Sequence, residues 1–297
     1  MASSPVALPS GAGGAPTSSL PLASGELSPG QAAELATLTS QIDAATGLSL
    51  SSYKEACFRR RVAVRMRATG VTTYAGYGGV LRADPSEYER LLAAVTINVS
   101  RFFRNRDLWR TVSDRVLPEL AERDSPFLNA WSAGCAAGEE PYTIAMVLED
   151  FHRARPGARV ERFRLVATDV DPDALDCARR AEYGQLALTE TTRADLERWF
   201  EPGGPPYRPV ERVRRQVRFW RLDLLTAHFP REQSLIVCRN VIMYFDRDSQ
   251  VSILRRMHKA LVPGGFLILG RAENLVGDTA GLFEPVSLAM RVYRRAP

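Results

Sequence analysis

Cysteine, histidine and lysine are all scarce in this sequence, and their scarcity argues against a zinc site and a secretory signal. The four cysteines, Cys57, Cys135, Cys177 and Cys238, form no C-x-x-C pair, and there are only three histidines. A zinc site is therefore not expected, and we predict reduced, buried thiols in a cytoplasmic protein. Residues 1–53 contain no Lys or Arg, which argues against a secretory signal, because such a signal begins with basic residues.

Long apolar runs are missing as well. No window approaches 18 uninterrupted apolar residues, so we expect no membrane insertion. The 297 residues, 45% of them apolar and 25% charged, suit one large soluble domain or two small ones. The net charge is +5, and nearly every cation is Arg. Guanidinium groups match carboxylates well, but charge alone does not separate an acidic protein partner from nucleic acid.

The most informative stretch runs from Leu128 to Asp169. It reads as a strand, a turn with Gly134 and Gly138, an apolar helix, and a second strand that ends on Asp169. This βαβ pattern is typical of a nucleotide-type site, because small residues let a ligand approach the backbone and the acid accepts ribose hydroxyls. The turn lacks both G-x-G-x-x-G and the P-loop motif. A looser turn favours S-adenosylmethionine, which has no phosphates.

The N-terminal part divides into a tail and a helical domain. Residues 1–27 are rich in Ala, Ser, Pro and Gly without apolar periodicity, so we predict a disordered tail. Residues 28–97 show helical apolar spacing. The predicted helices are Gln31–Ala45, which Gly47 ends, then Tyr53–Arg67, Thr73–Arg82 and Ser86–Val95.

The helix predicted at Tyr53–Arg67 is rich in arginine. Phe58, Val62 and Met66 lie on one side of it. The arginines around them form either a solvated face, which is the commoner case, or a docking surface for an acidic partner. They are Arg59, Arg60, Arg61, Arg65 and Arg67.

The remaining residues, 98–297, alternate strands with helices. Beyond Asp169 we predict strands near residues 218–225, 234–238, 266–269 and 289–293, and helices at 172–181 and 247–261. This alternation predicts a doubly wound, mostly parallel α/β sheet with an antiparallel ending. The polar segment at residues 182–217 is an insertion in this domain.

Several long motifs then occur in one order. They are Asn98-Val-Ser-Arg-Phe-Phe-Arg104, Trp131-Ser-Ala-Gly-Cys-Ala-Ala-Gly-Glu-Glu-Pro-Tyr142, Ala167-Thr-Asp-Val-Asp171, Cys238-Arg-Asn-Val-Ile-Met-Tyr-Phe-Asp246 and Pro263-Gly-Gly265. Over roughly residues 30–294 the chain resembles the CheR family, the bacterial chemotaxis-receptor glutamate O-methyltransferases. The resemblance implies an N-terminal all-helical domain, a Rossmann-like class I S-adenosylmethionine-dependent methyltransferase domain, and a small β-subdomain inserted within about residues 183–217.

The resemblance also implies a cofactor and the residues that hold it. The cofactor would be S-adenosyl-L-methionine, with S-adenosyl-L-homocysteine as its product. Asn98, Ser100 and Arg104 would form a loop that closes over the cofactor, and Gly134 belongs to the glycine turn. Glu140 and Asp169 would hold the methionine amine and the ribose. Asp223 and Leu224 would lie beside the adenine, and Arg239 and Asn240 would contact the cofactor after the fourth strand.

Arg104 and Tyr244 occupy the family positions nearest the transferred methyl, and are the predicted catalytic residues. A glutamate carboxylate is already ionised at pH 7, so its methylation needs no general base. Positioning of the two reactants supplies ~7–11 kcal/mol of the barrier in such reactions. Arg104 would hold the substrate carboxylate, and Tyr244 would orient it. Without the resemblance, Arg104 reads as a surface partner of Asp107, and Tyr244 as a core aromatic residue.

By the same resemblance, the protein substrate would be the acidic cytoplasmic helical bundle of a chemoreceptor, held by Arg59, Arg60 and Arg61. A monomer is the default expectation for the oligomeric state. The segment around residues 200–219 is compact, which predicts independence from a receptor's C-terminal peptide tether. Nucleic-acid methylation fits the basic charge but lacks an Asn/Asp-Pro-Pro-Tyr type of motif, so no nucleic-acid partner is expected.

Departures from the family pattern leave a second hypothesis open. Ser100 replaces a usual Thr, Ala136-Ala137 replace Ser-Thr, Asp223 replaces Asn, and Arg271-Ala272 replace His-Ser. These changes concern rate and substrate preference more than cofactor binding. The alternative is a non-catalytic S-adenosylmethionine-binding sensor or scaffold.

Overall fold

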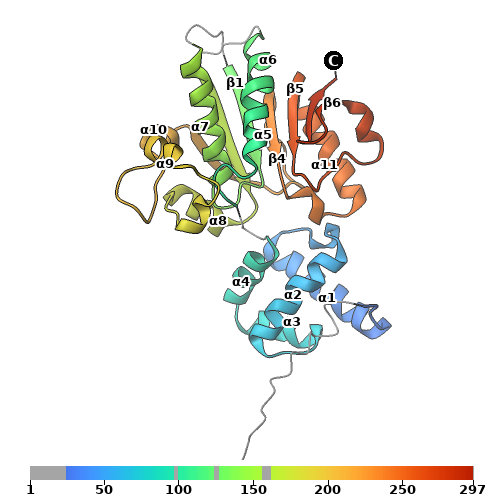
Figure 1. Cartoon of the computed structure of the whole chain (residues 1–297). Helices are drawn as coiled ribbons and strands as arrows, with labels where there is room; N and C mark the ends of the chain where they lie inside the picture. The colour runs from blue at the N-terminus through green and yellow to red at the C-terminus, as the bar shows by residue number, and fades with distance from the viewer. Residues whose placement is uncertain (1–24, 97–99, 124–126, 156–161, 297) are drawn as a thin grey trace, which may run out of the picture.

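The computed structural model of the chain describes residues 25–96, 100–123, 127–155 and 162–296 (Figure 1). Nearly all of the predicted tail and the predicted site residue Asn98 lie outside these ranges. A helical domain packs against the edge of a sheet-containing domain, at the end where the parallel strands finish (Figure 1).

The helical domain consists of four α-helices, each within a few residues of its predicted position. Ser28 caps the first helix, with Gln31 completing a capping box, and Gly47 ends it at φ 71° in the left-handed region. Apolar side chains at helical spacing, such as Ile42, Val62 and Leu81, are fully buried between the helices. The elements are α1 (Pro29–Thr46), a 3₁₀ turn η2 (Leu50–Ser52), α2 (Glu55–Thr69), α3 (Tyr74–Ala83) and α4 (Ser86–Val95).

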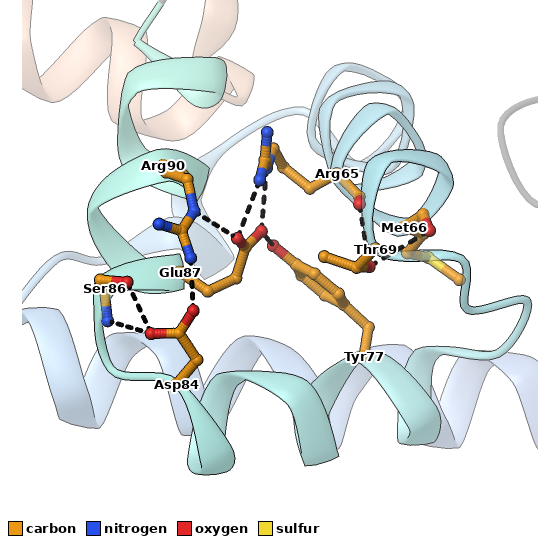
Figure 2. Close-up of polar contacts among 8 residues, drawn as sticks. All are labelled: Arg65, Met66, Thr69, Tyr77, Asp84, Ser86, Glu87 and Arg90. Atoms are coloured by element: carbon orange, nitrogen blue, oxygen red, sulfur yellow. Dashed lines mark hydrogen bonds and ion pairs between the residues drawn. The ribbon is translucent and has the colours of Figure 1, made fainter.

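One buried carboxylate, that of Glu87 on α4, joins three of these helices (Figure 2). Arg65 of α2 donates to it through Nε and Nη2, each at 2.8 Å. The Tyr77 hydroxyl of α3 and Nε of Arg90 also donate to it, again at 2.8 Å. The hydrogen bonds from Arg65 are the main cause that lowers the pKa of Glu87 to about 2. Arg65 is therefore a packing residue and not part of a docking surface.

The sheet has seven strands in the order β3-β2-β1-β4-β5-β7-β6. The first five strands in that order are parallel, and β7 is antiparallel to both β5 and β6. The predicted parallel sheet with an antiparallel ending is confirmed, although β6 was not predicted. The strands are β1 (Phe127–Ala133), β2 (Arg162–Asp169), β3 (Val217–Arg221), β4 (Gln233–Cys238), β5 (Leu261–Leu269), β6 (Phe283–Ser287) and β7 (Val292–Arg295).

Helices cover both faces of the sheet. Along β1, Leu128 and Ala130 enter one hydrophobic core while Trp131 and Ala133 enter the other, because successive side chains of a strand point to opposite faces. The first face carries α5 (Arg106–Thr111), the π-helical η3 (Val112–Val116), α6 (Leu117–Ala121), α7 (Glu139–Ala154) and α8 (Pro172–Arg180), and the second carries α11 (Arg247–Ala260).

The inserted segment differs from the predicted β-subdomain. It contains η4 (Gln185–Leu188), α9 (Arg193–Trp199) and α10 (Glu211–Arg214). Its strand-like pairing amounts to two isolated bridges among the described residues, Tyr183 with Tyr207 and Phe200 with Pro209. A capping box from Thr192 starts α9. Prolines in the loop 202–206 cannot donate to a strand ladder, which explains why strands do not extend there.

The cysteines only partly match the prediction of buried thiols. All four cysteines are free, but only Cys135 and Cys238 are buried, whereas Cys177 is exposed. Across the described ranges, no helix is long and apolar enough to cross a bilayer, and no cluster of three potential metal ligands was found.

Candidate functional site

A cavity of about 320 Å³ lies between the carboxyl ends of the parallel strands and the helical domain. Its walls come from the turns that follow β1, β2, β3 and β4, while Tyr53, Val95 and Thr96 close it from the helical side. The strand order reverses between β1 and β4, because the chain proceeds to β2 on one side and to β5 on the other. Crevices at this switch point are where α/β sheets bind ligands.

Every predicted cofactor and catalytic residue that the structure describes lines this cavity. They are Ser100, Arg104, Gly134, Glu140, Asp169, Asp223, Leu224, Arg239, Asn240 and Tyr244. They come from five separate segments of the chain, and they converge because parallel strands end at the same edge of the sheet. Their individual roles toward a ligand remain predictions.

The turn after β1 leaves no room for a side chain at Gly134. Its φ is 77°, in the left-handed region that favours glycine. A Cβ built there would lie 2.3 Å from Cγ2 of Val241, in the turn after β4. The backbone N–H of Gly134 donates to the carbonyl of Thr168 at 2.8 Å. The turn after β1 and the turn after β4 are thus in direct contact, and the backbone at Gly134 forms part of the cavity wall.

Asp169, at the end of β2, is a buried carboxylate. Its Oδ2 accepts from the backbone N–H of Ala136 at 2.8 Å, and its Oδ1 accepts from that of Asp171 at 3.0 Å. Burial raises the pKa of Asp169, and these backbone hydrogen bonds oppose the rise. A carboxylate can accept about four hydrogen bonds, so Asp169 keeps acceptor capacity for the hydroxyls of a ribose.

Glu140 and Arg239 form a buried ion pair, with Nη1 of Arg239 at 3.2 Å from Oε2 of Glu140. Ser132 donates to the other carboxylate oxygen at 2.9 Å. Burial raises the pKa of Glu140, and the charge of Arg239 opposes this. Nη2 of Arg239 donates to the carbonyl of Arg104 at 3.2 Å and to Oδ1 of Asn105 at 2.5 Å. The guanidinium predicted to contact a cofactor therefore holds the loop that carries Arg104.

Hydrogen bonds hold the turn after β3, which carries Asp223 and Leu224. Oδ1 of Asp223 accepts from the backbone N–H of Leu225 at 2.8 Å, and its Oδ2 accepts from the Thr226 hydroxyl at 3.3 Å. Arg256 of α11 donates to the carbonyls of Leu224 and Leu225, at 2.6 and 3.0 Å. Asp223 thus stabilises its own turn.

Arg104 and Tyr244 are both half-buried residues of the cavity lining. Asp107, the surface partner considered for Arg104, pairs with Arg271. Tyr244 closes the 3₁₀ turn η5 (Ile242–Tyr244), and its carbonyl accepts from the backbone N–H of Lys54 at 2.8 Å. The segment before α2 is therefore attached to the predicted catalytic turn.

Tyr53 is a cavity residue that the sequence did not reveal. Its ring packs edge-on against Phe245 with centroids 4.8 Å apart. Burial, and then the charges of Asp223 and Asp169, raise the pKa of its hydroxyl. No motif or spacing signals such a residue, because its neighbours lie in three distant segments. A tyrosine directly before an arginine-rich helix was the available hint.

The predicted substrate-binding arginines on α2 separate into two groups. Arg59 is only 7% exposed, and its Nη1 donates to Glu55 at 3.4 Å, so its prediction as a docking residue is wrong. The buried face of α2 includes Phe58, Arg59, Val62, Ala63 and Met66, which is wide enough to cover Arg59. Arg60 is exposed and Arg61 is half-buried, so these two remain available to a partner.

Comparison with known proteins agrees with this architecture. The family description "CheR methyltransferase, SAM binding domain" matches residues 98–292, and "CheR methyltransferase, all-alpha domain" matches residues 33–96. A chemotaxis protein methyltransferase of Listeria monocytogenes is 34% identical over 230 residues, covering 77% of this chain and 86% of the relative. That of Escherichia coli K12 is 34% identical over 236 residues, covering 77% and 79%. Chemotaxis protein methyltransferase 2 of Pseudomonas aeruginosa is 34% identical over 237 residues, covering 78% and 82%.

Proposed function

The chain belongs to the CheR methyltransferase family of S-adenosylmethionine-dependent enzymes, and from that premise we propose that it methylates glutamate side chains on chemoreceptor signalling helices. The products would be glutamate methyl esters and S-adenosylhomocysteine. The observation that carries the proposal is the convergence of ten predicted site residues on one cavity at the switch point of the sheet.

The residues of the cavity fit the cofactor. The backbone at Gly134 offers a close approach, and the Asp169 carboxylate keeps acceptor capacity for a ribose. When bound, the cofactor would supply an electrophilic methyl group on its sulfonium. The substrate carboxylate would form a bond to that methyl in line as the methyl–sulfur bond breaks, with S-adenosylhomocysteine as the leaving group. The protein's task is then alignment and exclusion of water, with no proton transfer to a catalytic base.

Arg104 and Tyr244 are the groups we assign to the reacting end. Arg104 would pair with the incoming carboxylate, and Tyr244 would orient it. A different residue holds the backbone of each: Arg239 donates a hydrogen bond to the Arg104 carbonyl, and the backbone N–H of Lys54 donates one to the Tyr244 carbonyl. Both backbone positions are therefore determined by contacts that exist before a substrate arrives.

The receptor bundle would dock on α2, whose accessible cations include Arg60 and Arg61. The N-terminal end of this helix is joined to the cavity through Tyr53. An acidic helix lying on α2 would thus present its glutamates near the reacting end. The insert at residues 183–217 has no regular strand among its described residues before Val217. Recognition of the receptor would be independent of a C-terminal tether.

The test is transfer of radiolabelled methyl from S-adenosylmethionine to receptor-containing membranes. We expect base-labile label with the wild type, a loss of about 100-fold with Arg104→Ala, as is usual when one charge-stabilising group is removed, and no change with Arg193→Ala. Arg193 is the matched control because its side chain is 92% exposed and pairs with Glu197. Calorimetric binding of the cofactor without labelling of any receptor would instead support the sensor or scaffold.

A further inference from the structure

Glu273 lies outside the cavity, in the turn after β5, and is only 3% exposed. Its carboxylate accepts four backbone hydrogen bonds. Oε2 accepts from the N–H groups of Asn240 at 2.8 Å and Gly270 at 2.7 Å. Oε1 accepts from those of Val241 at 2.8 Å and Met243 at 3.2 Å. One side chain thus satisfies most of the donors of the turn that follows β4.

The turn that Glu273 holds, residues 240–244, needs such support. Asn240 has φ 61°, a left-handed conformation that non-glycine residues adopt at a cost. Gly270 belongs to the same arrangement, because a Cβ there would lie 2.6 Å from Oε2 of Glu273 and 2.8 Å from the backbone nitrogen of Asn240. The two turns are therefore fitted to the carboxylate, with no space for an alternative packing.

The opposite side of this turn is held by the helical domain. Nζ of Lys54 donates to the carbonyl of Met243 at 2.8 Å, and its backbone N–H donates to that of Tyr244. Glu273 binds the N–H groups from the sheet side, and Lys54 binds the carbonyls from the other side. The conformation that directs Asn240 and Tyr244 toward the cavity depends on both contacts.

We propose that Glu273 is a positioning residue for the reaction: it fixes the turn so that Asn240 and Tyr244 meet the cofactor and the methyl acceptor in the correct geometry. The role rests on the proposed function and adds to it a residue that touches neither reactant. A negative charge is essential to the role, because four N–H groups point at one group. Glutamine would present an NH₂ donor to two of them.

The experiment compares Glu273→Gln with Glu284→Gln, a control that removes an exposed ion pair to Arg294. Three quantities are measured on the full chain: amide hydrogen exchange of peptides covering residues 238–246, the Kd for S-adenosylmethionine by calorimetry, and kcat and KM with receptor membranes. For Glu273→Gln we expect exchange in the turn at least tenfold faster, a tenfold higher Kd, and a kcat reduced at least tenfold, with the receptor KM changed less than threefold. The control should match the wild type in all three.

Unchanged exchange in the turn, or an unchanged kcat, overturns the proposal. If wild-type protein labels no receptor, the proposed function fails, while exchange and Kd still decide the role of Glu273: both altered supports it, and both unchanged overturns it. If Glu273→Gln does not fold, Gly270→Ala displaces the carboxylate and is measured in the same way. In a Tyr244→Phe background, Glu273→Gln should lower kcat by no more than about threefold further, since coupled positions are not additive. If Glu273→Gln lowers kcat as much in the Tyr244→Phe background as in the wild type, Glu273 does not act through Tyr244.

Discussion

Replacement of Glu87 by glutamine is predicted to destabilise the helical domain in a manner that depends on pH. In the folded protein the pKa of Glu87 falls from 4.5 to about 2, with the Arg65 hydrogen bonds as the largest cause. At about 1.4 kcal/mol per tenfold change in proton affinity, the ionised carboxylate contributes roughly 3 kcal/mol at pH 7. Glu87→Gln should lose that amount, which agrees with the ~3–5 kcal/mol typical for breaking a buried ion pair.

The sign of the pH dependence follows from the lowered pKa. The stabilisation is fully present above pH 4.5, where the carboxylate is ionised in both folded and unfolded chains. It decreases as the pH falls toward 2, because the unfolded chain binds a proton first. At pH 3 about 1.4 kcal/mol remains, so the difference between the wild type and Glu87→Gln should shrink to less than half.

Urea unfolding at pH 7 and pH 3 measures this difference. All four tryptophans lie beyond residue 98, so their fluorescence reports the sheet domain, while circular dichroism includes the helical domain. The loss should appear in the dichroism transition. Glu211→Gln, which removes an exposed ion pair to Arg215, is the control and should leave the midpoint unchanged. A difference below about 1 kcal/mol at pH 7, or one that does not shrink at pH 3, would contradict the assignment of Glu87.

Three further predictions concern the cavity and α2. Gly134→Ala should weaken S-adenosylmethionine binding at least tenfold. Gly47 is the control, because it has a similar φ but no atom within 4 Å of an added Cβ, so Gly47→Ala should cost only ~1–2 kcal/mol of stability. Equal Kd values of the two variants by calorimetry would refute this. Reversing Arg60 and Arg61 to Glu should raise the receptor KM at least tenfold with little change in kcat, and unchanged kinetics would make α2 a solvated face. Tyr53→Ala should raise the Kd for the cofactor while thermal unfolding stays cooperative, and an unaltered Kd would exclude the tyrosine from the site.

Local signals were sufficient for most of the fold. The helices of the N-terminal domain were predictable because caps such as Ser28 and Gly47 flank runs with clear helical spacing. β4 and β5 were predictable from the apolar runs Leu235–Cys238 and Phe266–Leu269, which are typical of strands buried on both faces. β6 gave no such signal, because it is an edge strand with Pro285 within it, and only one of its five residues, Phe283, is buried.

Asp169 was predictable from the βαβ pattern because it ends a strand, whereas Asn240, just after β4, was predicted through the family resemblance. The topology brings such positions together without any need for side-chain detail. Tyr53 and Glu273 were not predictable, because each acts through contacts with segments that only the tertiary fold brings near. The burial of Arg59 was missed for a related reason: its exposure depends on how wide a face α2 buries, which its neighbours in space decide.

Arg239 illustrates what a motif cannot specify. Its position at the end of β4 was correct, yet its guanidinium is engaged by Glu140, by Asn105 and by the carbonyl of Arg104. Removing it would leave the Glu140 carboxylate buried without its cation and would release the loop that carries Arg104. Since both effects reach the cavity, loss of activity in an Arg239 variant would look the same as loss of a direct cofactor contact. Only the contacts of the side chain distinguish a residue that binds a ligand from one that holds the groups that do.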